Sequence, residues 1–193
     1  MEIENYVFIT ENFLDEITLK KLTQYMKNDI EWEKASIITD GNKKYGLVDE
    51  KVRKVKSKFI TNLGNEKCTS IFWFNFLKHS FMKFTLKYFD IIGNAHPKMT
   101  EHFEINFLKY EETNFYMLHS DYHHTTPRQL SYIFVLNDDY EGGEITFHFS
   151  KKHTKTFKIS KNMGVVFPSN FIFTHHINPV TSGTRYVVVG WMA

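Results

Sequence analysis

Residues 164–192 read GVVFPSNFIFTHHINPVTSGTRYVVVGWM, and this stretch decides the fold class. Its β-branched and aromatic runs are interrupted by turn residues, a pattern typical of short strands joined by tight turns. The same pattern extends back to residue 103. It predicts strands at 103–110, 115–119, 130–136, 144–149, 154–159, 164–167, 172–176 and 186–192. About eight short strands with regular turns predict a two-sheet jelly roll, or double-stranded β-helix.

The first hundred residues predict mainly helices, unlike the strand-rich second half. A strand at 6–10 precedes a helix that Asp15 or Thr18 could cap. The expected apolar stripe of this helix consists of Ile17, Leu22, Tyr25 and Met26. A second helix at 71–89 is apolar around most of its circumference, so we expect it to pack against a sheet as a buttress. The fold class is therefore α+β, with N-terminal helices supporting a jelly-roll core.

Length and composition fit one domain. A chain of 193 residues can bury a substantial core, and neither a repeat nor a Ser/Gly-rich linker divides it. We expect a single domain over residues 1–193, with helical support over about 1–100 and the β-roll over about 101–193. The formal charge of +2 gives no electrostatic reason to expect binding to nucleic acid or to an anionic membrane.

The single cysteine, Cys68, excludes an intramolecular disulfide and a cysteine-based zinc or iron–sulfur site. The first ten residues, MEIENYVFIT, lack the basic and apolar regions of a signal peptide. The longest apolar stretch, 71–89, is interrupted by charged and polar residues, so we do not expect it to span a bilayer. These features predict a cytoplasmic protein in a reducing environment.

Residues 40–58 form a basic segment with two glycines. Its cationic residues are Lys43, Lys44, Lys51, Arg53, Lys54, Lys56 and Lys58. A charge run of this kind is typical of a solvated, mobile surface segment. The alternative is a flexible flap that closes over a nearby active site, and the sequence leaves both interpretations open.

The tripeptide His119–Asp121 ends an apolar predicted strand and has the spacing of a metal-binding pair. Side chains two residues apart in a strand point to the same side, so the imidazole and the carboxylate can face one ion. A second histidine from elsewhere would complete the two-histidine, one-carboxylate arrangement of non-haem Fe(II) oxygenases, which leaves coordination positions open. The spacing alone is weak evidence, because structural hydrogen bonding also explains it and residues 102–104, HFE, share it.

Five further motifs follow in order along the chain. They are LN at 136–137, GGEI at 142–145, FP at 167–168, HHINPV at 175–180 and GTR at 183–185. Together with His119–Asp121, they make roughly residues 103–192 resemble the catalytic core of the prolyl 4-hydroxylase-like 2-oxoglutarate/Fe(II) dioxygenases. That family has His-x-Asp, then Leu-Asn, Gly-Gly-Glu-Leu, Phe-Pro, His-Glu-Val-x-Pro-Val and Gly-x-Arg or Gly-x-Lys. Each motif is short, and the specificity lies in their joint order.

The resemblance implies that His175 is the third metal ligand and that His176 stands in place of the family's glutamate. Adjacent strand residues face opposite sides, so only one of the two histidines can reach the ion. Arg185 takes the position of the family's basic residue, where a guanidinium can form two charge-assisted hydrogen bonds to the distal carboxylate of 2-oxoglutarate. By the same resemblance, Tyr110 and Ser131 are expected to contact 2-oxoglutarate, although Tyr110 also fits a packing role.

Three other positions bear on the expected pocket. Ile133 should face it if its strand alternates regularly. Trp191 matches a family tryptophan near the end of the last strand, and a structural aromatic residue is an equal alternative. Thr113 stands where the family usually has glycine, which leaves the conformation of that turn open.

The resemblance implies Fe(II), 2-oxoglutarate and O2 as cofactors, with an ascorbate requirement left open. The expected reaction couples decarboxylation of 2-oxoglutarate to succinate with hydroxylation of a C–H bond, and it requires no separate acid or base. The nearest resemblance is to prolyl 4-hydroxylases acting on peptidyl proline. The expected partner is therefore a peptide or small-molecule substrate, and the oligomeric state is not indicated.

Other functions stay open at this point. A free amino acid or another small molecule is the alternative substrate, and a non-catalytic metal-binding β-roll module is the alternative function, since two histidines and an aspartate also accept zinc. A nucleic-acid demethylase of the same superfamily is disfavoured. The pattern of those proteins has a second arginine several residues beyond the cosubstrate arginine, whereas Arg185 is the last basic residue of this chain.

Overall fold

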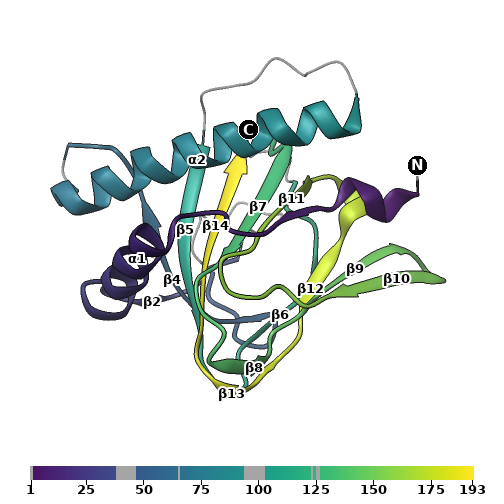
Figure 1. The fold of residues 1–193 in the computed structure, drawn as a ribbon. Helices are drawn as coiled ribbons and strands as arrows, with labels where there is room; N and C mark the ends of the chain where they lie inside the picture. The colour runs from purple at the N-terminus through teal and green to yellow at the C-terminus, as the bar shows by residue number, and fades with distance from the viewer. Residues whose placement is uncertain (1, 38–46, 65, 94–102, 123, 125–126) are drawn as a thin grey trace.

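The computed structural model describes residues 2–37, 47–64, 66–93, 103–122, 124 and 127–193. Within these ranges the strands form a seven-stranded sheet, a five-stranded sheet and a two-stranded sheet. Figure 1 shows α1 and α2 on one side of the seven-stranded sheet and the five-stranded sheet on its other side. This is the double-stranded β-helix with supporting helices that the sequence predicts.

The elements are the following. The helices are η1 (Ile3–Tyr6), α1 (Glu16–Asn28), α2 (Cys68–Ile92) and η2 (Phe171–Phe173). The first seven strands are β1 (Phe8–Thr10), β2 (Glu33–Lys34), β3 (Arg53–Lys54), β4 (Lys56–Ile60), β5 (Phe103–Tyr110), β6 (Phe115–His119) and β7 (Leu130–Val135). The rest are β8 (Tyr140–Gly142), β9 (Ile145–Ser150), β10 (His153–Phe157), β11 (Gly164–Pro168), β12 (His175–Ile177), β13 (Val180–Gly183) and β14 (Arg185–Met192). The sheet orders are β1-β11-β7-β14-β5-β4-β2, β10-β9-β12-β6-β3 and β13-β8.

Helix α1 begins where a side-chain cap satisfies its free backbone amides. The carboxylate of Asp15 accepts a hydrogen bond of 3.0 Å from the backbone N–H of Thr18, which identifies Asp15 as the N-cap. The buried face consists of Leu19, Leu22, Tyr25 and Met26. The prediction for Ile17 was wrong, because its side chain is 69% exposed in the first turn.

Helix α2 is longer than predicted and ends at Ile92, and the following Gly93, with φ of 66°, is a left-handed C-cap. Its buried aromatic residues pack on the outer face of the large sheet, against side chains such as Phe107 and Phe134. Among the described residues, none of the helices is both long and apolar enough to cross a membrane.

Two hydrophobic clusters lie on opposite faces of the seven-stranded sheet. Strand β5 shows how one sequence serves both, because its side chains alternate. Ile105 and Phe107 belong to the cluster beneath the helices, whereas Leu108 and Tyr110 belong to the cluster between the two sheets. His175 contacts this second cluster through the rings of Phe147 and Phe167.

Most predicted strands in the second half of the chain are present, and β5 and β6 have the predicted bounds. The prediction of a strand at 172–176 was partly wrong, because residues 171–173 form a 3-10 turn and β12 begins at His175. The side-chain oxygen of Asn170 accepts a 3.0 Å hydrogen bond from the N–H of Ile172 and caps this turn. The short strands β8 and β13 were not predicted.

The described part of the basic segment 40–58, residues 47–58, is not a solvated surface segment, because it contributes to two paired strands. Strand β3 pairs with β6 of the five-stranded sheet, and β4 pairs with β5 of the seven-stranded sheet. Arg53 and Ser57 are only 8% and 7% exposed. Residues 40–46 lie outside the described residues, and the interpretation of the segment as a flap stays a prediction.

Gly190 of β14 lies directly beneath α2. A Cβ at this position would lie 2.8 Å from a ring carbon of Phe81, which is fully buried and has little room to move. Gly190→Ala is therefore expected to lower the free energy of unfolding by about 1–3 kcal/mol through overpacking. Urea denaturation measures the difference. Gly64→Ala is the matched control, because nothing lies within 4 Å of its added Cβ; equal effects of the two substitutions would contradict the close packing of α2.

Candidate metal centre

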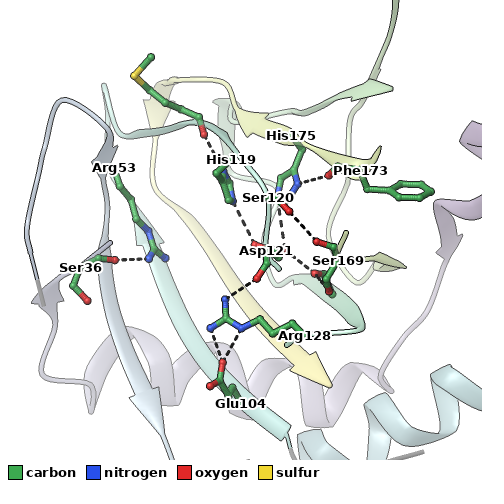
Figure 2. Close-up of polar contacts among 12 residues, drawn as sticks. Ser36, Arg53, Glu104, His119, Ser120, Asp121, Arg128, Ser169, Phe173 and His175 are labelled. Atoms are coloured by element: carbon green, nitrogen blue, oxygen red, sulfur yellow. Dashed lines mark hydrogen bonds and ion pairs between the residues drawn. The ribbon is translucent and has the colours of Figure 1, made fainter. Parts of the chain in front are cut away.

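The pairing of two strands brings the predicted metal-binding residues together. His119 ends β6 and His175 begins β12, and the antiparallel register places these two residues opposite each other. Asp121 follows two residues after His119. One side-chain donor atom from each of the three residues lies within 4.8 Å of the other two. Figure 2 shows the three side chains converging.

Both imidazoles are held in the orientation that a metal ligand needs. Nδ1 of His119 lies 2.8 Å from the carbonyl oxygen of Met117, and Nδ1 of His175 lies 3.0 Å from that of Phe173. A carbonyl can only accept, so each Nδ1 carries the proton and donates it. Each Nε2 then presents a lone pair toward Asp121, at 3.5 Å from Oδ1 for His119 and 3.9 Å from Oδ2 for His175.

Asp121 is fixed by a hydroxyl group on the facing sheet. Ser131 Oγ donates a hydrogen bond of 2.6 Å to Asp121 Oδ2 and lies 2.8 Å from Ser169 Oγ. Burial by itself raises the pKa of Asp121, but the nearby His175 and His119 and the Ser131 hydrogen bond outweigh it and hold the pKa below its ordinary value. The carboxylate is therefore ionised and oriented.

His175 is almost completely buried, and this keeps its ring neutral. Burial, with the neighbouring His119, lowers the pKa of His175 to about 4. The rings of Phe147 and Phe167 lie 5.4 and 5.1 Å from it, centroid to centroid. Two neutral imidazoles and one carboxylate make a donor set that fits Fe(II) and leaves half of an octahedron free.

Tyr116 packs against His119, and Arg53 packs against Tyr116. The ring of Tyr116 stacks on His119 at 3.6 Å with an interplanar angle of 18°, and the Arg53 guanidinium lies 4.7 Å from the Tyr116 centroid. Arg53 also donates a 2.9 Å hydrogen bond to the carbonyl of Ser36. We did not predict this stack, because only the pairing of β3 with β6 brings Arg53 to the site.

Arg185 is a buried cation at the start of β14. It is 2% exposed, and its Nε donates a 3.3 Å hydrogen bond to the hydroxyl of Tyr140. The ion pairs found among the described residues do not include it. Gly143 makes room for it, because a Cβ there would lie 2.9 Å from Arg185 Cδ. A buried guanidinium without a carboxylate partner is costly, so this position fits the distal carboxylate of 2-oxoglutarate.

Tyr110 and Ser131 are the other predicted cosubstrate contacts. Tyr110 lies opposite Arg185 in the sheet, with the guanidinium carbon 5.4 Å from its ring centroid, and burial raises its pKa. The hydroxyl of Ser131 contacts Asp121, a partner that we did not predict. Ile133 lies in the cluster between the sheets, as expected. Contacts of Tyr110 and Ser131 with 2-oxoglutarate stay predictions.

The alternative ligand candidates in the sequence, among the described residues, have other hydrogen-bond or ion-pair partners. His176 is hydrogen-bonded at 2.9 Å to both His148 and Asn178 and lies on the opposite face of β12 from His175. Glu104 forms an ion pair with Arg128. His102, the other member of that His-x-Glu sequence, lies outside the described residues.

Thr113 and Arg128 lie in the segments before and after β6. Thr113 takes the left-handed conformation, with φ of 64°, that makes glycine common at such a position. Its N–H donates to the carbonyl of Val180 at 2.8 Å. Arg128, which pairs with Glu104, also lies 3.9 Å above the ring of Trp191. This Glu104–Arg128–Trp191 group was not predicted.

Known proteins are similar to this chain in sequence and in fold. Residues 105–193 match the family model described as the 2OG-Fe(II) oxygenase superfamily. A PKHD-type hydroxylase of Prochlorococcus marinus is 29% identical over 192 residues, which cover 96% of this chain and 77% of that protein. A PKHD-type hydroxylase of Synechococcus sp. is 39% identical over 67 residues, only 34% of this chain and 29% of that protein.

Two solved structures show the same fold at low sequence identity. A prolyl-4-hydroxylase of Pseudomonas putida superposes with a TM-score of 0.69 at 18% identity, over 96% of this chain and 91% of that chain. A prolyl hydroxylase of Trichoplax adhaerens, in complex with a peptide fragment of the hypoxia inducible factor oxygen degradation domain, superposes with a TM-score of 0.73 at 15% identity, over 97% and 83%.

The fold and the His–Asp–His group define a 2-oxoglutarate/Fe(II) oxygenase. Residues 105–193 match the superfamily that the motifs resemble, and the chain shares its fold with the two prolyl hydroxylases. Its cofactors are accordingly Fe(II), 2-oxoglutarate and O2.

Ser131→Ala tests the support of Asp121. Without the hydroxyl, the carboxylate loses the hydrogen bond that orients it, and Fe(II) affinity is expected to fall roughly 10- to 100-fold, as for other groups that orient metal ligands. Anaerobic Fe(II) titration measures the dissociation constant. Thr146→Ala is the control, because that hydroxyl bonds to Thr156 on the adjacent strand and not to a proposed ligand. Unchanged Fe(II) affinity in Ser131→Ala would contradict the supporting role.

Proposed function

We propose that His119, Asp121 and His175 hold Fe(II), that Arg185 anchors 2-oxoglutarate, and that the protein hydroxylates proline in a peptide. The observation that carries this proposal is the convergence of three donor atoms within 4.8 Å in the same interior as a buried guanidinium without an ion-pair partner among the described residues. A zinc-binding or non-catalytic β-roll would have no use for such a guanidinium.

The protein's own groups have distinct tasks in this proposal. When bound, Fe(II) with 2-oxoglutarate supplies the O2-dependent oxidation that hydroxylates a C–H bond. The two histidines and Asp121 fix the position of the ion, and Arg185 orients the cosubstrate from its far end by paired hydrogen bonds. The phenylalanine side chains around His175 exclude water from that side of the site. No side chain is required as a general acid or base.

A peptide is the substrate that the surroundings of the site favour. Tyr122, the residue after Asp121, is 50% exposed and offers an aromatic surface to an extended chain. The prolyl hydroxylase of Trichoplax adhaerens, which shares the fold, was solved with a peptide fragment. A free amino acid is the second candidate, since the site itself needs only a small C–H group.

We also propose that residues 1–193 form one domain and act in the cytoplasm. The single domain is supported by β3 and β4, which come from the first third of the chain and join different sheets of the β-roll. The cytoplasmic location is supported by the absence of any cysteine besides the exposed Cys68.

His175→Ala tests the ligand assignment and separates the enzyme from a binding module. The substitution removes one of three ligands, so Fe(II)-dependent conversion of 2-oxoglutarate to succinate is expected to fall at least about 100-fold. Succinate is measured with and without proline peptides, free proline and ascorbate. The neighbouring His176→Ala is the matched control and should retain most of the activity, because His176 faces away from Asp121. Full succinate formation by His175→Ala would overturn the assignment.

A further inference from the structure

Asn106 in the middle of β5 is a polar residue without a polar partner. Its side chain is 0% exposed, yet neither its Nδ2 nor its Oδ1 has a hydrogen-bond partner in the part of the chain that the structure describes. Within that part, the only other buried side-chain atom in this state is Nε of Arg53. Buried polar groups are nearly always paired, so an amide with both ends unpaired requires an explanation.

The position of Asn106 places it on the inner face of the large sheet. Alternation along β5 puts it on the same face as Glu104 and Tyr110, because residues two and four apart share a face. Its neighbours across the sheet are Phe59 of β4 and Val189 of β14, and Val189 lies in the cluster between the sheets. Asn106 is thus on the face that carries both the proposed cosubstrate end of the site and the Glu104–Arg128 pair.

The register of β14 shows at which end of this face Asn106 lies. Arg185, the proposed cosubstrate anchor, is opposite Tyr110, whereas Trp191 is opposite both Glu104 and Ser131. Same-face neighbours along a strand are about 7 Å apart, so Asn106 is one such step from Glu104 and two from Tyr110. Asn106 therefore lies nearer to Trp191 than to Arg185 along β14. Ser131, whose hydroxyl is hydrogen-bonded to Asp121, lies opposite Trp191 and so at the same end of this face.

The unpaired amide does not serve the stability of the fold. Leaving a buried donor and acceptor unpaired costs free energy, whereas an apolar side chain of similar shape would avoid that cost. Leucine has nearly the same shape as asparagine and would suit a position flanked by Phe59 and Val189. A polar residue kept at such a position is explained by a ligand that pairs with it. Arg185, the other proposed ligand-binding residue of this interior, is also buried, with 2% of its surface exposed. Burial of Asn106 is therefore compatible with a ligand-binding role.

The two unpaired atoms specify the chemistry of that ligand. Nδ2 needs an acceptor and Oδ1 needs a donor. The dianion of 2-oxoglutarate offers acceptors alone and would leave Oδ1 unpaired. In an extended peptide the N–H and C=O of one residue point to the same side, and one side-chain amide can pair with both. Proline has no N–H, so the pairing residue must be a neighbour of the target proline.

We propose that Asn106 is a specificity-determining residue that binds the backbone N–H and C=O of a residue adjacent to the hydroxylated proline. The inference rests on the proposed function, because it requires that the substrate be a peptide. It assigns to this chain a preference for prolines within an extended segment over free proline.

The test compares Asn106→Leu with the wild-type protein in binding and in stability. Both are loaded anaerobically with Mn(II) and 2-oxoglutarate, and the affinities for a proline-containing peptide and for 2-oxoglutarate are measured by calorimetry. Loss of two hydrogen bonds is expected to weaken peptide binding about tenfold or more, while the affinity for 2-oxoglutarate, measured without peptide, shifts less than about twofold. The melting temperature of the metal-free variant is expected to equal or exceed that of the wild type.

Phe107→Leu is the matched control on the opposite face of the same strand. It lies in the cluster beneath the helices, so it should lower the melting temperature by several degrees without changing peptide affinity. Unchanged peptide affinity in Asn106→Leu, or a lowered melting temperature with unchanged affinity, would overturn the inference and indicate a structural role. Wild-type protein that forms succinate with free proline but binds no peptide contradicts the peptide substrate and the inference, and leaves the metal and cosubstrate assignments intact.

Discussion

The antiparallel pairing of β12 with β6 is the interaction on which the site depends. It places His175 opposite His119, although the two residues are far apart in the chain. In each case the carbonyl two residues earlier in the sequence receives the ring Nδ1–H, so the local backbone also fixes the tautomer. A shift of one residue in this register would turn His175 to the other face and bring His176 inward. The geometry of the candidate metal centre is thus a consequence of strand register.

The large sheet supplies the remaining groups from the facing side. Ser131 of β7 holds the carboxylate of Asp121, and Arg185 of β14 places a positive charge in the same interior. Helices α1 and α2 cover the outer face of this sheet and bury its apolar side chains, and they do not lie on the inner face (Figure 1). The N-terminal half therefore contributes core packing, and through β3 it also contributes Arg53 beside the candidate metal centre.

Sequence patterns were sufficient where local properties dominate. The alternating apolar residues of β5 and β6 gave their bounds, and the ordered motifs led to the side chains that the structure brings together. Patterns failed where tertiary contacts decide. The polar strand β3 looks like a solvated segment until its pairing with β6 buries Arg53, and the apolar residues 171–173 form a capped turn in place of a strand. The unpaired state of Asn106 has no sequence signal, because it depends on what surrounds the side chain in the folded chain.

The central claim is that His119, Asp121 and His175 bind one Fe(II) and leave room for 2-oxoglutarate to chelate it. Anaerobic absorption titration tests it most directly, because a metal-to-ligand charge-transfer band forms only when 2-oxoglutarate coordinates the bound ion. The account predicts a band that saturates at one Fe(II) and one 2-oxoglutarate per chain and that Asp121→Ala abolishes. A wild-type protein without the band, or an Asp121→Ala variant that retains it at the same Fe(II) affinity, would contradict the account.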